Sequence, residues 1–290
     1  MRVLTGKVAV ITGAASGFGR EFARLGASLG MRLALADVES DALARVVDEL
    51  RAQGAEVFGE TVDVRRGEAV ERLAERTLER FGAAHVLFNN AGVGAGGLLW
   101  EATEHDWQWV LGVNLWGVIH GVRSFVPRML AQGDECHVVN TASVAGLLAP
   151  QRMGVYNVSK HAVVALSETL YQDLRLVGAP IGVTLLCPAY VPTGIANSER
   201  NRPDELRDDA PPTESMLEAQ RAMEKAVSSG RIGAEQVARM TFDAIRENRF
   251  YVITHPNILP SVELRLQDVL MQRNPSDPYT YKPGVAQHAR

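Results

Sequence analysis

Residues Thr12-Gly13-Ala14-Ala15-Ser16-Gly17-Phe18-Gly19 join a short apolar run, 7–12, directly to an amphipathic stretch, 18–29. Glycine at three of these positions allows the backbone to turn sharply and to approach an anion closely. The start of a helix adds free N–H groups and the positive end of its dipole. A glycine-rich turn between a strand and a helix is typical of a dinucleotide phosphate cradle, whereas such a turn alone would indicate only an ordinary loop.

Apolar runs of strand length alternate along the chain with amphipathic stretches of helical length. This alternation predicts parallel strands with helices on both faces, a Rossmann-type doubly wound α/β sheet of about seven strands. No repeat and no low-complexity linker divides the chain, so we expect one domain over residues 1–273. The predicted strands are 7–12, 32–36, 56–62, 85–89, 136–141, 181–186 and 250–254, and the predicted helices are 18–29, 40–53, 66–81, 104–131, 153–176 and 234–247.

Two segments break the alternation. Residues 189–231 form a long, charged insertion with four prolines. Structureless loops of this length are uncommon in compact domains and tend to be lids or binding segments. We therefore expect short helices that form a mobile, lid-like cover. Residues 274–290 carry three further prolines and are expected to be a C-terminal tail or an arm that reaches another subunit.

The composition argues against several classes of function. The net charge is −4 and no basic run is present, so we expect no nucleic acid and no membrane as partners. The apolar run near the N-terminus is too short for a signal peptide or a membrane span. Cys136 and Cys187 lie in strand-like stretches, which fits a reducing compartment with the cytoplasm as the default. The histidines form no ligand-spaced cluster, and no metal is expected.

Asp37 ends the second predicted strand, 18 residues after Gly19. A carboxylate there can accept hydrogen bonds from both hydroxyls of an adenosine ribose, and it would repel a 2′-phosphate. Ser16 precedes the second glycine of the turn, so no cation is placed there to offset that repulsion. The sequence therefore favours NAD over NADP. The alternative is that Asp37 only caps the helix that follows it.

Three further motifs follow in order along the chain: Asn89-Asn90-Ala91-Gly92 after the fourth strand, Ser143 at the end of the fifth, and Tyr156-Asn157-Val158-Ser159-Lys160. With the glycine turn and Asn114, they make the chain resemble the short-chain dehydrogenase/reductase family. A single Tyr-x-x-x-Lys would be common by chance, but the series in this order is specific. The resemblance extends from Gly6 to Thr193 and is weaker beyond.

The resemblance implies which residues hold the cofactor. Asp63 and Val64 are similar to the family's pair that lies against the adenine, with Asp63 bonding its amino group. Val191 and Thr193 sit where the family bonds the nicotinamide carboxamide and the phosphates. Their placement is less defined because this chain has Pro188-Ala189 where the family usually has Pro-Gly. The expected cofactor-binding residues are Gly13, Ser16, Gly17, Phe18, Gly19, Asp37, Asp63, Val64, Asn90, Ala91, Gly92, Tyr156, Lys160, Pro188, Val191 and Thr193.

Tyr156 and Lys160 are four residues apart and hence lie on one face of a helix. A phenol with a pKa of about 10 is a poor base at neutral pH, and a neighbouring ammonium would favour the phenolate. Ser143 can bond the substrate oxygen as its charge changes. The resemblance implies that Asn114 holds a water molecule in a proton relay. The expected catalytic set is thus Asn114, Ser143, Tyr156 and Lys160; the alternative is a surface i,i+4 pair without a catalytic role.

The segments expected near the nicotinamide are mostly apolar or glycine, which favours a hydrophobic secondary alcohol or ketone as substrate. The predicted substrate pocket consists of Val93, Gly94, Val144, Ala145, Leu148 and Tyr190. The resemblance further implies a homo-oligomer, a dimer or more usually a homotetramer. Together these patterns predict a soluble NAD-dependent oxidoreductase. The alternatives are an NADP-dependent carbonyl reductase, a non-catalytic NAD-binding protein, and a structural interaction module.

Overall fold

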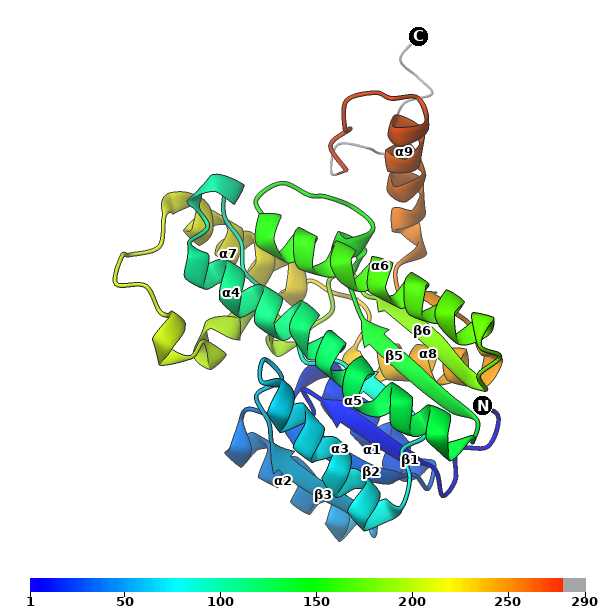
Figure 1. Ribbon diagram of the computed structural model, residues 1–290. Helices are drawn as coiled ribbons and strands as arrows, with labels where there is room; N and C mark the ends of the chain where they lie inside the picture. Colours follow the sequence, from blue (N-terminus) through cyan, green and yellow to red (C-terminus); the bar gives the residue numbers. More distant parts are fainter. Residues whose placement is uncertain (279–290) are drawn as a thin grey trace.

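Seven parallel strands form the central sheet of the computed structural model, which describes residues 1–278 (Figure 1). The strand order β3-β2-β1-β4-β5-β6-β7 runs outward in both directions from the junction of β1 and β4, where ligands bind in open α/β sheets. The predicted Rossmann-type fold is confirmed. The strands are β1 (Val8–Thr12), β2 (Arg32–Asp37), β3 (Val57–Thr61), β4 (Val86–Asn89), β5 (Cys136–Thr141), β6 (Ile181–Cys187) and β7 (Tyr251–Ile253).

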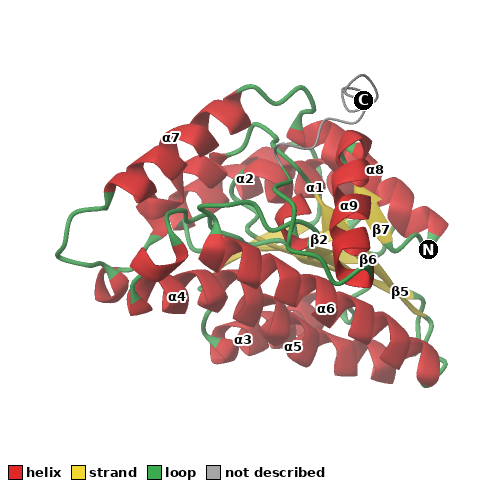
Figure 2. Ribbon diagram, turned by 90° about the horizontal axis from the view of Figure 1, so that it is seen from above, coloured by secondary structure: helices red, strands yellow, loops and turns green. Residues whose placement is uncertain are grey.

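Helices cover both faces of the sheet, because alternate strand residues point to opposite sides (Figure 2). In β1, Ala9 and Ile11 join a core with Phe22, whereas Val8 and Val10 join a second core with Phe125. Burial on both sides explains why the strands are nearly continuous apolar runs. One face carries α1 (Gly17–Ser28), α2 (Ser40–Ala52) and α8 (Ala234–Glu247); the other carries α3 (Gly67–Phe81), α4 (Glu104–Leu111), α5 (Gly117–Gln132) and α6 (Gly154–Leu176).

Aromatic packing holds α1 in place above the sheet. Phe22 is fully buried and stacks on Phe88 of β4, with ring centroids 4.8 Å apart. Burial of such a side chain contributes about 1.5–3 kcal/mol. The contact directs the N-terminus of α1 toward the carboxyl edge of the sheet, where β1 ends.

The single long helix predicted over residues 104–131 is interrupted. A π-helical turn, Gly112–Trp116, separates α4 from α5 and contains Asn114. Glycines permit close approach on both sides of this turn: a β-carbon at Gly112 would lie 3.1 Å from Arg65 Cγ, and one at Gly117 would lie 2.9 Å from Val64 Cγ2. The apolar periodicity continues across the interruption, so the sequence pattern did not reveal it.

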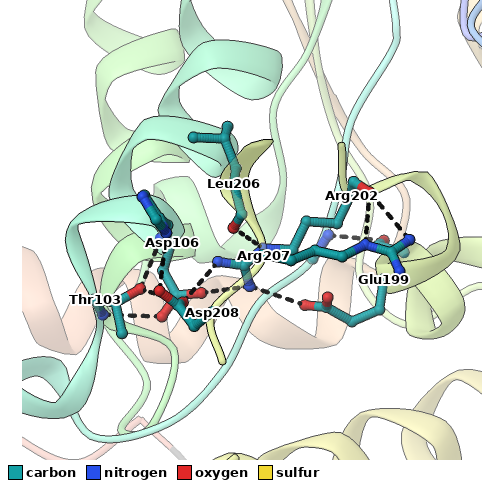
Figure 3. A network of polar contacts seen from close by, with 10 residues as sticks. Thr103, Asp106, Glu199, Arg202, Leu206, Arg207 and Asp208 are labelled. Atoms are coloured by element: carbon teal, nitrogen blue, oxygen red, sulfur yellow. Dashed lines mark hydrogen bonds and ion pairs between the residues drawn. The ribbon is translucent and has the colours of Figure 1, made fainter. Parts of the chain in front are cut away.

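The insertion at residues 189–231 contains two 3₁₀ segments, Gly194–Asn201 and Asp204–Leu206, and a longer helix, α7 (Glu214–Ser228). The short helices expected there are present, but α7 has 15 residues. Figure 3 shows how Arg202 anchors the insertion: it pairs with Asp106 of α4 at 2.7 Å and with Asp208 at 3.2 Å. The guanidinium also lies 5.2 Å from the ring centroid of Trp109.

A further helix that the sequence pattern missed, α9 (Leu259–Leu270), follows β7 and projects from the body of the domain (Figure 1). The predicted tail, 274–290, lies outside the described residues from position 279 onward. Among residues 1–278, no helix combines the length and apolar character needed to cross a bilayer.

Candidate active site

A cavity of about 1150 Å³ opens at the carboxyl edge of the sheet. It exceeds the range of roughly 300–1000 Å³ that is usual for small-ligand pockets, so it has room for a dinucleotide and a second molecule. All predicted site residues line it except Gly19, Gly94 and Asn114. The residues brought together are Gly13, Ser16, Gly17, Phe18, Asp37, Asp63, Val64, Asn90, Ala91, Gly92, Val93, Ser143, Val144, Ala145, Leu148, Tyr156, Lys160, Pro188, Tyr190, Val191 and Thr193.

The glycine turn has backbone angles and packing that require glycine. Gly13 and Gly17 have φ of +67° and +51°. A β-carbon at Gly19 would lie 2.0 Å from the carbonyl oxygen of Gly13, so Gly19 lets α1 begin directly against β1 without lining the cavity. Ser16 is the N-cap of α1 but makes no side-chain capping bond, so the first N–H groups of the helix are not satisfied by it. This turn fits a bound phosphate.

The carboxylate of Asp37 is held by the backbone on both sides of the cleft. Its oxygens accept hydrogen bonds from the N–H groups of Ala15, at 2.8 Å, and Glu39, at 3.0 Å. Burial raises the pKa of Asp37, and the two backbone donors oppose that shift. The N-cap of α2 is Glu39, so Asp37 is not the helix cap of the alternative interpretation. Its remaining lone pairs are available to ribose hydroxyls.

Asp63 lies in the cavity wall after β3, but its carboxylate is engaged. Arg65 Nη2 lies 2.7 Å from Asp63 Oδ2, and Arg65 Nε contacts both oxygens. The expected bond from an adenine amino group would therefore share this carboxylate with Arg65. Arg65 also lines the cavity, although no sequence motif indicates a role for it.

Asn90 fastens the ends of three strands together. Its Nδ2 donates to the carbonyl of Thr12 at 3.0 Å, and its Oδ1 accepts from Thr141 Oγ1 at 3.4 Å. Thr12 Oγ1 accepts the N–H groups of Asn90 and Ala91 at 3.0 and 3.1 Å. These bonds make a rigid floor beneath the cavity where β1, β4 and β5 end.

Tyr156 and Ser143 both line the cavity, and the Ser143 hydroxyl is one of the groups that act on the phenol of Tyr156. Ser143 Oγ also donates to the carbonyl of Pro188 at 3.3 Å and accepts from the N–H of Ala145 at 3.1 Å, which fixes its rotamer. Tyr156 is 8% exposed. Burial raises its pKa to about 12, although the nearby Ser143 hydroxyl acts in the opposite direction.

Lys160 lies beside Tyr156, as predicted, and its ammonium group donates a hydrogen bond to the carbonyl oxygen of Thr141. The ammonium nitrogen is 5.6 Å from the centroid of the phenol ring. Burial lowers the pKa of Lys160 to about 8. The pKa of Tyr156 thus lies above that of a free phenol, opposite to the lowering expected from Lys160, because burial disfavours the charged phenolate.

Asn114 lies behind the cavity and is fully buried. Its Oδ1 accepts the N–H of Val93 at 2.8 Å, and its Nδ2 donates to the carbonyl of Val93 at 3.0 Å and to Ser159 Oγ at 3.1 Å. The side chain thus ties the segment after β4 to α6, which carries Tyr156. These contacts position the site, and the water-mediated proton relay that the resemblance implies for Asn114 stays a prediction.

The Pro188-Ala189 departure is accommodated without strain. The backbone of Ala189 does not have a positive φ, and its N–H donates to Thr254 Oγ1 at 3.3 Å. Val191 and Thr193 both line the cavity. Gly94 instead packs outside the lining, where its N–H donates to Ser198 Oγ of the insertion at 2.9 Å.

Two parts of the cavity wall carry no sequence motif, although the first lies almost wholly within the insertion that is expected to cover the site. One is the segment 223–232, from α7 and the turn after it, and the other is 254–261, which follows β7. Both lie far along the chain from the motifs, and only the fold brings them to the cleft. They add Met223, Ile232 and Ile258 to the apolar lining. Within the described part of the chain, no group of three or more His, Cys, Asp or Glu is placed to hold a metal ion.

Comparison with known proteins identifies the family. A family model described as short chain dehydrogenase matches residues 7–204. The "CLA biosynthesis dehydrogenase/reductase" of Lactiplantibacillus plantarum is 32% identical over 278 residues, which are 95% of this chain and 97% of that protein. The "1-deoxy-11-beta-hydroxypentalenate dehydrogenase" of Streptomyces exfoliatus is 34% identical over 264 residues, 90% and 86% of the two chains.

A solved structure is more similar still. The crystal structure of a short chain dehydrogenase/reductase from Burkholderia phymatum in complex with NAD is 61% identical, with a TM-score of 0.95 and coverage of 97% of this chain and 100% of that one. The chain belongs to the short-chain dehydrogenase family. Its class of activity is that of an oxidoreductase.

Proposed function

We propose that the chain is an NAD-dependent oxidoreductase that transfers a hydride between the nicotinamide and a hydrophobic secondary alcohol or ketone, with Tyr156 as general acid and base. One observation carries the proposal: the buried Tyr156 lines the same cavity as Ser143, the glycine turn and Asp37. Pure binding of a dinucleotide does not require a phenol at this point. A non-catalytic NAD-binding protein or a structural module is therefore disfavoured.

The residues present fit a dinucleotide. The glycine turn and the start of α1 suit the pyrophosphate, and Asp37 suits the adenosine ribose. The Burkholderia phymatum structure in complex with NAD supports the same cofactor here, over the NADP of a carbonyl reductase. When bound, NAD supplies the hydride acceptor or donor for the reaction.

The side chains of this protein handle the proton and orient the substrate. With a pKa of about 12, Tyr156 is protonated at neutral pH and can donate its proton to a ketone oxygen. Ser143 can donate a hydrogen bond to the same oxygen as it gains charge. Alcohol oxidation needs the phenolate, which positive charge from Lys160 and an oxidised nicotinamide would favour. Lys160, held by the carbonyl of Thr141, keeps its cation beside the reacting groups.

The substrate class follows from the lining. Val93, Val144 and Leu148 provide an apolar surface near Tyr156, and Met153 and Ile258 extend it. An apolar wall with few polar groups selects hydrophobic molecules. The Streptomyces exfoliatus relative is named for the dehydrogenation of a hydroxylated compound, which supports an alcohol with a bulky skeleton.

A panel of cyclic and aryl secondary alcohols, followed by the absorbance of reduced nicotinamide, tests the proposal. We expect turnover with NAD and a loss of at least about a hundredfold in Y156F, the usual contribution of a general acid or base. Y171F is the matched control, since Tyr171 lies on the same helix, packs against Phe250 and does not line the cavity. Turnover by Y156F equal to that of Y171F would refute the role of Tyr156.

We further propose that the chain forms a homo-oligomer and that it is located in the cytoplasm. Trp116, at the end of the π-helical turn, and Val158, on α6, are 49% and 46% exposed, and they suit contact with a second subunit. Sedimentation velocity of the purified chain should give the mass of a dimer or tetramer. A monomer at all concentrations would contradict the first prediction, and fluorescence microscopy of a tagged chain tests the second.

A further inference from the structure

A cation of the insertion lies at the adenosine end of the cavity and is held there by a carboxylate. Arg200 Nη2 is 2.7 Å from Glu39 Oε1, and Asn201 Nδ2 donates to the same oxygen at 2.9 Å. Both partners of the ion pair line the cavity together with Asp37. Glu39 lies in the turn after β2, 161 positions from Arg200, so the pair joins the insertion to the rim of the nucleotide cleft.

Glu39 is electrostatically linked to Asp37. Its N–H donates to Asp37 Oδ1, and its charge raises the pKa of Asp37, in addition to the larger effect of burial. Burial alone would raise the pKa of Glu39, but the bonds from Asn201 and Arg200 outweigh it and hold that pKa below its ordinary value. Glu39 is therefore ionised at neutral pH.

Both terminal nitrogens of the Arg200 guanidinium are engaged in its present position. Besides Glu39, it donates from Nη1 to the carbonyls of Gly194 and Asn197, at 3.1 and 2.5 Å. A guanidinium fork is well matched to a phosphate group, which it can bind through two parallel hydrogen bonds. Glu39 occupies one arm of this fork and neutralises its charge.

We propose that Glu39 is a second residue that determines cofactor specificity: by engaging Arg200, it withholds from the adenosine site the guanidinium that would otherwise bind a 2′-phosphate. The inference rests on the proposed function, because it requires a dinucleotide with its adenosine ribose at Asp37. Asp37 repels the 2′-phosphate directly, whereas Glu39 engages Arg200, the cation that could offset that repulsion. A change at Glu39 should therefore alter the preference for NAD over NADP while Asp37 is intact.

Calorimetric titration of the full chain with NAD and with NADP tests the inference without any turnover. In E39Q, the ratio of NADP affinity to NAD affinity should rise about tenfold, the size of one unit-charge interaction across a partly exposed cleft. In E39Q/R200M the gain should disappear, and in E39Q/R200K part of it should remain, because lysine keeps the charge without the fork. E235Q is the matched control: Glu235 pairs with Arg239 at the same 2.7 Å, but on an exposed face outside the cavity lining.

Each outcome decides between defined alternatives. Equal changes in the affinities for NAD and NADP in E39Q would mean that the pair only holds the insertion in place, and the inference would be wrong. A gain that persists in E39Q/R200M would likewise overturn it, because Arg200 would not be the phosphate ligand. Wild-type protein that binds neither dinucleotide would refute the proposed function itself and the inference with it. Thermal melts of each variant establish that all are folded under the titration conditions.

Discussion

The ammonium nitrogen of Lys160 donates a hydrogen bond to the carbonyl oxygen of Thr141 at 3.0 Å. This bond joins α6 to the carboxyl end of β5 and places a buried cation at the cavity floor, next to the ring of Tyr156. An ammonium has three donors, and Thr141 uses one of them. The arrangement keeps the cation beside the phenol that we propose as the general acid and base, at the cost of burying a charge.

The rate of ketone reduction should depend on the protonation of Lys160. Its pKa is about 8, whereas Tyr156, at about 12, keeps its proton over the accessible range. We expect kcat/KM for reduction to be level below pH 8 and to fall above it, since this parameter reports groups of the free enzyme. In K160M the rate should be low and the inflection near pH 8 absent. A wild-type profile that stays level to pH 10 would contradict this role.

Removal of the Lys160 charge should stabilise the fold. The pKa falls from 10.5 to about 8 on folding, so the unfolded chain binds more protons between these values, and the free energy of unfolding rises as the pH rises through that window. Below pH 8 the cost of burying the charged ammonium of Lys160, about 3 kcal/mol, lowers the free energy of unfolding in full. With about 1 kcal/mol lost from the Thr141 bond, K160M should be about 2 kcal/mol more stable than wild type at pH 7.

Urea unfolding at pH 7 and at pH 9.5 measures this effect. The advantage of K160M should shrink at the higher pH, because wild type has by then lost most of its penalty. A variant less stable than wild type at pH 7, or a difference that does not change with pH, would show that burial of this cation carries no such cost.

Gly19→Ala should disrupt the glycine turn. Its β-carbon would meet the carbonyl oxygen of Gly13 at 2.0 Å, so either the turn or the start of α1 must shift. We expect dinucleotide affinity to fall by at least about tenfold and the melting temperature to drop by several degrees, as for overpacking costs of about 1–3 kcal/mol. Gly233→Ala is the control, since nothing lies within 4 Å of its added carbon. Equal affinities in the two variants would argue against a tight turn at the phosphate site.

Arg202→Met should destabilise the protein strongly. Arg202 is 9% exposed, and its loss leaves the buried Asp106 without its cation (Figure 3). Breaking a buried ion pair from one side costs about 3–5 kcal/mol. Arg239→Met, which breaks an exposed pair, should change stability by less than about 1 kcal/mol. Chemical denaturation of both variants compares them, and similar small effects would mean that the insertion is not anchored through Arg202.

Much of the fold and of the cofactor site could be predicted because it is encoded locally. The strand–turn–helix context around Gly13 and Gly17 defines a phosphate cradle within eight residues. Parallel strands bring their carboxyl ends to one edge, so Asp37 and Ser143, which end or follow two of the strands, are expected at one cleft although they are distant in sequence. The structure brings these residues together around one cavity.

Other features depend on tertiary contacts that no local pattern encodes. The π-helical turn at Asn114 has no distinct periodicity, and so the helix was predicted as continuous. The wall formed by residues 223–232 and 254–261 and the pair of Glu39 with Arg200 arise only when the insertion folds back over the cleft. Desolvation of the Tyr156 phenol could not be weighed against the Lys160 charge before their burial was known.

Direct hydride transfer at the Tyr156 centre can be measured by isotopic labelling. A secondary alcohol identified in the panel is deuterated at its carbinol carbon, and the reduced nicotinamide formed in one turnover is analysed by mass spectrometry. We expect the deuterium to be recovered on the reduced nicotinamide, at a rate that Y156F lowers by at least about a hundredfold. Deuterium found in the solvent, or transferred as fast by Y156F, would contradict this expectation.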